Sequence, residues 1–116
     1  MGRYRDRLQI VADILAIASR GAKKTWIMYQ ANLSYKLLCK YLDEVLECGL
    51  VRVDDKEDCY VVAPKGEQFL EKFSAYAARR ERVKEELGTM RKERALLEKM
   101  YTNTRVRDSE RKFFSV

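Results

Sequence analysis

The fold of this chain is decided by residues 25–48, which read TWIMYQANLSYKLLCKYLDEVLEC. Thr25 is a favourable N-cap for a short helix that ends near Gln30, and Ser34 is a favourable N-cap for a longer helix that ends near Cys48. Residues 31–33 leave room only for a tight connection, and Gly49 follows where a C-terminal cap is expected. The stretch therefore predicts two helices joined by a tight turn.

The longer of these helices has one apolar and one polar face. Its apolar residues recur at a helical spacing, which places them on one side: Leu38, Leu42, Val45 and Leu46. The opposite side carries Tyr35, Lys36, Cys39, Lys40, Asp43 and Glu47. In the shorter helix the spacing directs Ile27, Met28 and Ala31 to the core, whereas Trp26 and Tyr29 fit either the core or an outward position.

A helix with a wide buried face is predicted upstream, over residues 5–19. Its apolar residues form two adjoining stripes, one of Leu8, Val11, Ala12, Leu15 and Ala18 and one of Ile10, Ile14 and Ile17. Gly21 follows where a left-handed C-cap would end this helix. Downstream, residues 50–53 and 59–63 are β-prone and flank the charged run Asp54 to Asp58, which predicts a short hairpin.

The chain after the hairpin predicts one long helix. Pro64 suits its first position, because the missing N–H of proline has no intrahelical partner there. No second proline follows, and a heptad spacing continues as far as Tyr101. We call its positions the heptad seam; they are Phe73, Tyr76, Arg80, Val83, Leu87, Met90, Arg94, Leu97 and Tyr101. Residues 102–116 are polar and basic, and we expect them to form a loosely ordered tail.

The heptad seam predicts a dimer interface, although packing within one chain is the commoner role of such a stripe. A helix of about 38 residues is roughly 57 Å long, which is more than one small domain covers. The simplest partner is the same helix of a second copy. Arg80 and Arg94 interrupt the seam, and in an antiparallel pair each would reach a glutamate of the other copy and fix the register; the candidates are Glu81, Glu86 and Glu93.

The composition bounds the class of protein. The chain has 116 residues, of which 47% are apolar and 36% are charged, and this suits one small domain. No stretch approaches the roughly 20 apolar residues of a membrane-spanning helix, and the N-terminal residues lack a signal-peptide cleavage site. We therefore expect a cytoplasmic protein.

The residues that most enzymes need are missing. The sequence has no histidine, which excludes Ser-His, Cys-His and histidine-based metal chemistry, and it has no glycine-rich phosphate loop or metal-ligand cluster. Cys39, Cys48 and Cys59 lack a CxxC spacing, so free thiols are expected, with a Cys48–Cys59 disulfide as the alternative. We expect no enzyme activity, cofactor, metal or small-molecule ligand.

Taken together, the elements predict a mainly α protein of the α+β class. The order of helix, short helix, helix, hairpin and long helix is that of a winged helix-turn-helix protein. We expect a winged helix-turn-helix domain over residues 1–63, in which the hairpin is the wing. A dimerising coiled-coil helix is expected over residues 64–101, and a basic tail over residues 102–116.

In this arrangement the third helix enters the DNA major groove with its N-terminal residues nearest the bases. Lys36 and Lys40 lie one turn apart and suit phosphates or guanine acceptors, unless they simply form the solvated side of an amphipathic helix. Lys23 and Lys24 precede the second helix, from where they reach the phosphate backbone. The candidate DNA contacts are Lys23, Lys24, Asn32, Ser34, Tyr35, Lys36, Cys39, Lys40, Arg52 and Lys56.

The net charge of +6 is unevenly distributed along the chain. It is +4 over residues 1–34, −3 over residues 35–63, +3 over residues 64–101 and +2 over residues 102–116. The wing carries Asp54, Asp55, Glu57 and Asp58, which phosphate repels, so we expect it to stand off the groove or to contact a protein. DNA affinity would then come from the lysines outside the wing and from the basic N-terminus: Lys23, Lys24, Lys36, Lys40, Arg3, Arg5 and Arg7.

Part of the sequence resembles a known family. The stretch GAKKTWIMYQANLSYKLL (residues 21–38), Tyr41 with Leu42, Gly49 with Leu50, and Lys65 with Gly66 are similar to small archaeal winged-helix DNA-binding proteins that dimerise through an antiparallel C-terminal coiled coil. The resemblance covers residues 5–73 by sequence. It implies sequence-tolerant or operator-type binding of double-stranded DNA by a homodimer, in transcription regulation or chromatin organisation. The matching recognition-helix positions are Ser34, Tyr35, Lys36 and Lys40.

A nucleoid-associated, DNA-binding homodimer is therefore the main hypothesis. The alternative is a winged-helix module that binds another protein through its acidic wing or the heptad seam, with little DNA binding. An enzyme is the third hypothesis. Its only candidate catalytic groups would be carboxylates such as Asp54, Asp55 and Asp58.

Overall fold

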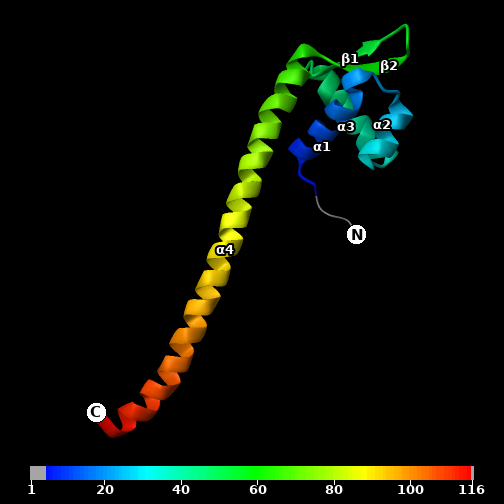
Figure 1. The fold of residues 1–116 in the computed structure, drawn as a ribbon. Coiled ribbons are helices and arrows are strands. Elements are labelled where there is room, and N and C mark those ends of the chain that lie inside the picture. The colour runs from blue at the N-terminus through cyan, green and yellow to red at the C-terminus, as the bar shows by residue number, and fades with distance from the viewer. Residues whose placement is uncertain (1–4, 116) are drawn as a thin grey trace. The chain divides into compact units, whose positions relative to one another are not determined.

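The computed structural model describes the backbone of residues 5–115 and the side chains of residues 5–102. It divides into two units, Met1–Tyr76 and Ala77–Val116. Along the chain the elements are α1 (Arg7–Ile17), the 3₁₀ turn η1 (Ala18–Arg20), α2 (Lys24–Ala31), α3 (Tyr35–Glu47), β1 (Val51–Asp54), β2 (Cys59–Val62) and α4 (Pro64–Ser115), as Figure 1 shows. This is the predicted winged helix-turn-helix order, mostly helical with a two-stranded wing.

The first helix is capped and tied down by local polar contacts. The Asp6 carboxylate accepts a 2.9 Å hydrogen bond from the backbone N–H of Gln9, as an N-cap should. The predicted helix over residues 5–19 is shorter in the structure, because α1 ends at Ile17 and tightens into η1. Gly21 has the positive φ expected of it, at 90°, but it follows η1 and does not cap α1. The tighter turn leads the chain into a bridge in which Ala22 and Tyr60 exchange backbone hydrogen bonds of 2.9 and 2.8 Å.

The second helix begins two residues earlier than predicted, at Lys24. Its N-cap is Lys23, which makes no side-chain capping bond, and Thr25 lies inside the first turn. The prediction of a Thr25 cap was therefore wrong. The position of this helix is set by the Ala22 bridge just before it and by burial of Ile27 and Ala31 in the core, not by a capping side chain.

The third helix and the hairpin follow the prediction closely. The Ser34 hydroxyl accepts a 3.2 Å hydrogen bond from the N–H of Leu37, Cys48 is the C-cap, and Gly49 has a φ of 77°. The strands pair antiparallel, with Val51 opposite Val62 and Asp54 opposite Cys59. The sequence therefore specifies both ends of α3 and the position of the wing.

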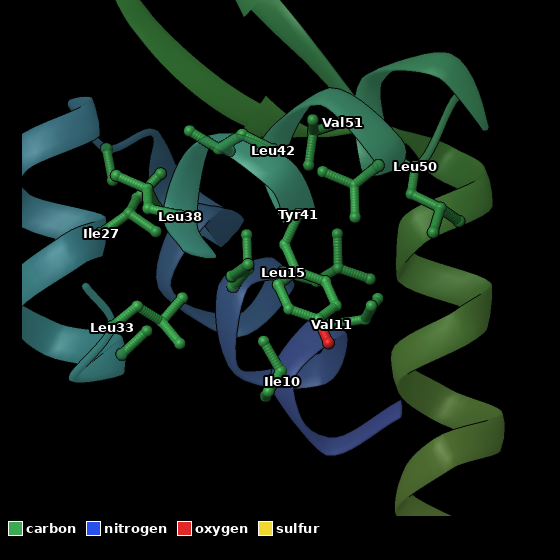
Figure 2. Close-up of a cluster of buried hydrophobic side chains, with 14 of the residues drawn as sticks. Ile10, Val11, Leu15, Ile27, Leu33, Leu38, Tyr41, Leu42, Leu50 and Val51 are labelled. Carbon is green, nitrogen blue, oxygen red and sulfur yellow. The ribbon is translucent and has the colours of Figure 1, made fainter. Parts of the chain in front are cut away.

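The core of the first unit lies between α1, α2, α3 and the base of the hairpin, and Figure 2 shows these side chains converging. Both predicted stripes of α1 contribute, since Ile14 and Leu15 are fully buried; Leu8 departs from its stripe and is 45% exposed. Trp26 and Tyr29, which fitted either position by sequence, are exposed. The buried cluster is Ile10, Val11, Ile14, Leu15, Ala22, Ile27, Ala31, Leu33, Leu38, Tyr41, Leu42, Val45, Leu50, Val51 and Val62, with Phe69 and Leu70 of α4 packed against it.

Gly66 lets the first turn of α4 lie directly against the hairpin. A Cβ added at this position would overlap the Leu50 carbonyl oxygen and would come within 2.6 Å of Val62 Cγ2, closer than real Cβ atoms approach. The neighbouring Lys65 ammonium donates a 2.7 Å hydrogen bond to the Cys48 carbonyl at the end of α3. The pair Lys65-Gly66 thus joins α4 to the end of α3.

Helix α4 continues to Ser115, beyond the predicted end near Tyr101. The physical reason is that the chain has no proline after Pro64 and no glycine after Gly88, so nothing in residues 102–115 stops a helix. The expectation of a loosely ordered tail from Thr102 therefore differs from the structure. Within the described residues, no helix is long and apolar enough to cross a membrane.

Candidate nucleic-acid interface

The turn between α2 and α3 is held by backbone hydrogen bonds. Asn32 adopts a left-handed conformation with φ 54°, and its N–H donates to the Tyr29 carbonyl at 3.2 Å. The Leu33 N–H donates to the Met28 carbonyl at 3.1 Å, and the Leu33 side chain is buried. Asparagine tolerates this conformation better than most residues. The tight helix-turn-helix connection predicted over residues 31–33 is therefore present.

The two faces of α3 are clearly separated. Leu38, Tyr41, Leu42 and Val45 are buried, and Figure 2 shows Leu38, Tyr41 and Leu42 among the core side chains. The solvent side presents the predicted contacts at the start of the helix: Ser34, Tyr35, Lys36 and Lys40 are exposed, and Cys39 is half-buried. The Ser34 hydroxyl oxygen caps the helix, so Ser34 stabilises α3 in the free protein.

Lys24 and Tyr35 connect the starts of the two helices. The Lys24 ammonium donates a 3.3 Å hydrogen bond to the Tyr35 hydroxyl, and Lys24 Nζ lies 4.9 Å from the centre of the Tyr35 ring. Hydrogen bonds to Tyr35, and then to Cys39, raise the pKa of Lys24. This ammonium is therefore positively charged and held on α3 by neighbours eleven and fifteen positions away in the sequence, a pairing that no periodicity indicated.

The sequence around the helix-turn-helix is rich in basic residues. Between Asp13 and Asp43 the sequence contains no carboxylate, whereas it contains Arg20, Lys23, Lys24, Lys36 and Lys40. The acidic balance of residues 35–63 comes from the last turns of α3 and from the wing. Lys23 and Lys24 at the start of α2 and Lys36 and Lys40 of α3 belong to neighbouring elements, because α2 and α3 pack together. We call α2, the turn and the exposed start of α3 the basic face; its predicted contacts are Lys23, Lys24, Asn32, Ser34, Tyr35, Lys36, Cys39 and Lys40.

The N-terminal arginines have structural partners. Arg5 forms a 2.8 Å ion pair with Asp13 and donates a 3.1 Å hydrogen bond to the Asn32 carbonyl, while Gln9 donates to the other Asp13 oxygen at 2.9 Å. Arg7 lies 3.8 Å from Glu44. Both arginines therefore have carboxylate partners within the chain, and their expected contribution to DNA affinity stays a prediction; Arg3 lies outside the described residues.

The wing places the two remaining candidates beside carboxylates. Arg52 and Lys56 are both exposed, and the Lys56 N–H donates to Asp54 Oδ1 at 3.1 Å within the turn. Asp55, Glu57 and Asp58 are exposed as well.

All three thiols are free, so the alternative Cys48–Cys59 disulfide is not formed. Within the described residues, no group of three or more acidic or cysteine side chains is placed to hold a metal ion.

Apart from Arg80 and Arg94, the heptad seam is mainly apolar, and it is largely open to solvent. Phe73, in the first unit, is half-buried, with its ring 6.2 Å from that of Phe69 and 5.9 Å from that of Tyr76. In the second unit the seam positions Val83, Leu87, Met90, Leu97 and Tyr101 are between 43% and 64% exposed. Arg94 pairs at 3.3 Å with Glu98, which lies one turn later in its own helix.

Three comparisons place this architecture among known proteins. A family model described as winged helix-turn-helix matches residues 4–81, which include every element from α1 to the first turns of α4. An uncharacterized protein of Methanocaldococcus jannaschii is 41% identical over 70 residues, covering 60% of this chain and 32% of that protein. This chain therefore spans about a third of the length of that curated relative. The crystal structure of Sso10a-2, a DNA-binding protein from Sulfolobus solfataricus, is similar with a TM-score of 0.63 and 25% identity over 68% of this chain and 85% of that one.

Proposed function

This chain belongs to the winged helix-turn-helix family, and we propose that it binds double-stranded DNA through the basic face. The observation that carries the proposal is the stretch of residues 14–42, which has five basic residues and no carboxylate and includes the exposed start of α3. Phosphate attraction supplies most of the affinity of such a surface. Similarity to a solved DNA-binding protein supports the same proposal.

The recognition helix of such a motif lies in the major groove with its N-terminal residues nearest the bases. In this chain those residues are Ser34, Tyr35, Lys36, Cys39 and Lys40, of which all but Cys39 are exposed. Lys23 and Lys24 at the start of α2 then face the phosphate backbone. Asn32 lies in the turn between the two helices. Arg52 and Lys56 contribute less, because the wing carboxylates beside them repel phosphate.

We further propose that the active species is a homodimer formed by the heptad seam. Monomeric proteins rarely expose a long apolar stripe, and the exposure of Leu87, Met90 and Leu97 supports a partner helix there. A second copy presents the same stripe, as a two-fold interface requires. Such a dimer carries two basic faces, and we propose that it works in the cytoplasm as a transcription regulator or a nucleoid-associated protein without enzymatic activity.

Salt-dependent DNA binding tests the proposal. Four lysines on each basic face give about eight phosphate contacts in a dimer, so the logarithm of the affinity should fall with the logarithm of salt concentration with a slope of about −7. Lys36→Gln with Lys40→Gln should reduce the slope by roughly half. Lys92→Gln with Lys99→Gln removes the same charge from α4 and should leave the slope unchanged. No binding by the wild-type protein at low salt would refute DNA binding.

Sedimentation velocity tests the dimer. Leu87→Glu places a carboxylate on the heptad seam, and because Leu87 is 43% exposed in the single chain the substitution leaves the fold of the first unit intact. It should convert dimer to monomer at micromolar concentration. Ala78→Glu, on the exposed side of the same helix and off the seam, is the matched control. A dimer that persists in Leu87→Glu would exclude the seam as the interface.

The acidic wing favours a second candidate function, a winged-helix module that binds another protein. Four of the five residues 54–58 are acidic, and the side chains of Asp55, Glu57 and Asp58 are exposed. A basic protein partner fits this surface better than DNA does. Asp55→Asn with Asp58→Asn should strengthen DNA binding if the wing lies near phosphate, and should leave it unchanged if the wing serves a protein.

A further inference from the structure

The contact between Lys24 and Tyr35 leaves the tyrosine proton unused. The ammonium donates to the phenol oxygen at 3.3 Å, and a phenol has one proton of its own to donate. Because the oxygen already accepts from a cation, its O–H is polarised and becomes a stronger donor. Tyr35 is 62% exposed, so this proton is available to a ligand at the surface.

Lys24 contributes further donors at the same place. An ammonium carries three N–H groups, and its neighbours on α3 are Tyr35 and Cys39, whose hydrogen bonds also raise the pKa of Lys24. The cation therefore keeps at least one N–H for a ligand. Because the ammonium also lies 4.9 Å from the Tyr35 ring centre, both side chains are oriented before binding, which lowers the entropy lost on association.

We propose that Lys24 and Tyr35 form a two-donor site for one backbone phosphate of DNA, in which Lys24 both supplies charge and orients the Tyr35 hydroxyl. This inference rests on the proposed function. A phosphate fits because it offers several acceptor oxygens to two neighbouring donors, one of them charged. The site lies where α2 and α3 begin, and phosphate contacts at such places fix the orientation of the protein on the duplex without reading its sequence.

Fluorescence anisotropy with the full chain and labelled duplexes tests the pair. Tyr35→Phe deletes one hydroxyl and keeps the ring that Lys24 contacts, so the fold is retained. It should weaken binding roughly tenfold, as removal of a hydrogen bond to a charged group does, with an unchanged salt slope. Lys24→Gln should weaken binding and reduce the slope by about 0.9 for each phosphate that the protein no longer neutralises. Lys92→Gln on α4 is the matched control for the lost charge, and it should have no effect.

Coupling between the two residues is the decisive readout. If Lys24 orients the hydroxyl, Tyr35→Phe should weaken binding less than about threefold in the Lys24→Gln background, because the oriented donor is already missing there. Equal tenfold losses in both backgrounds, or wild-type affinity of Tyr35→Phe, would overturn the pair. A loss that differs between AT-rich and GC-rich duplexes would overturn the phosphate assignment in favour of a base contact.

Structural effects and failure of the proposed function give different outcomes. If the pair only joins α2 to α3, both substitutions lower the melting temperature but leave affinity and salt slope unchanged at low temperature, which overturns the inference alone. If the wild-type protein binds no duplex at low salt, DNA binding and the phosphate site fail together. If Lys24→Gln does not fold, the affinity of Tyr35→Phe still tests the hydroxyl independently.

Discussion

Lys36→Glu should stabilise the fold while it weakens DNA binding. The charges of α3 run against its own dipole: Lys36 and Lys40 lie in the first half, Asp43, Glu44 and Glu47 lie in the second, and the first turn contains no acid and the last turn no base. A helix prefers the opposite order, with acids at its N-terminus and bases at its C-terminus. Lys36 and Lys40 also stand four residues apart, where like charges repel.

The magnitude follows from these two terms. Replacing a cation by an anion in the first turn stabilises the helix by about 0.3–1 kcal/mol through its dipole. Losing the repulsion from Lys40 and gaining an attraction to it together contribute about 0.4–1 kcal/mol. The exposure of Lys36 keeps the sum near the lower end. We expect a gain of about 1 kcal/mol, which raises the melting temperature of a domain of this size by roughly 4–8 °C.

Thermal and urea unfolding followed by circular dichroism measure the gain, and anisotropy titration measures the loss of affinity. Glu47→Lys is the matched control, because it corrects the charge at the other end of α3 and relieves repulsion from Asp43. It should stabilise the fold by a similar amount without weakening DNA binding. A Lys36→Glu protein that is less stable than wild type would refute the charge argument, and one that binds DNA with wild-type affinity would show that α3 does not contact DNA.

Other substitutions test the packing and capping that hold the basic face. Gly66→Ala should destabilise the first unit by about 3 kcal/mol, because overpacking against Leu50 and Val62 forces the backbone apart. Gly88→Ala is the matched control: an added Cβ meets nothing within 4 Å there, so the substitution should stabilise α4 by up to about 1 kcal/mol. Unfolding curves that rank the two variants in the opposite order would contradict the close approach at Gly66. Ser34→Ala should cost about 1 kcal/mol and Ser34→Gly only a few tenths, as measured by urea unfolding; equal costs would mean that the cap is unimportant. Arg5→Ala should lower stability by at most about 1 kcal/mol and leave the salt slope of DNA binding unchanged. A reduced slope would show that Arg5 contacts a DNA phosphate.

Much of the fold was predictable because its signals are local. Ser34 and Gly49 bound α3, the charged run after Val53 marks the wing, and Pro64 begins α4 in the structure as it does in the sequence. The predicted Thr25 cap failed for a different reason. The start of α2 is fixed by the bridge between Ala22 and Tyr60, which are far apart in the sequence, and no capping preference reports such a contact.

The candidate site was predictable in its residue types but not in its partnerships. Arg5 and Lys24 are both basic residues near a helix start, and the sequence treated them alike. In the structure Asp13 pairs with Arg5, whereas Lys24 has Tyr35 and Cys39 of α3 as neighbours in place of a carboxylate. Whether a basic side chain serves the fold or a ligand depends on which residues the tertiary structure brings beside it.

The sign of the net charge likewise depends on which residues are summed. The total of +6 suggests a polyanion partner, and a division at residue 35 makes the recognition helix and wing look acidic. Neither sum corresponds to a surface, because α3 carries its lysines and its acids at opposite ends. Residues 14–42, which include α2, the turn and the start of α3, contain five basic residues and no carboxylate. An arrangement that works against the stability of its own helix is best explained by a negatively charged ligand at the N-terminal end of α3.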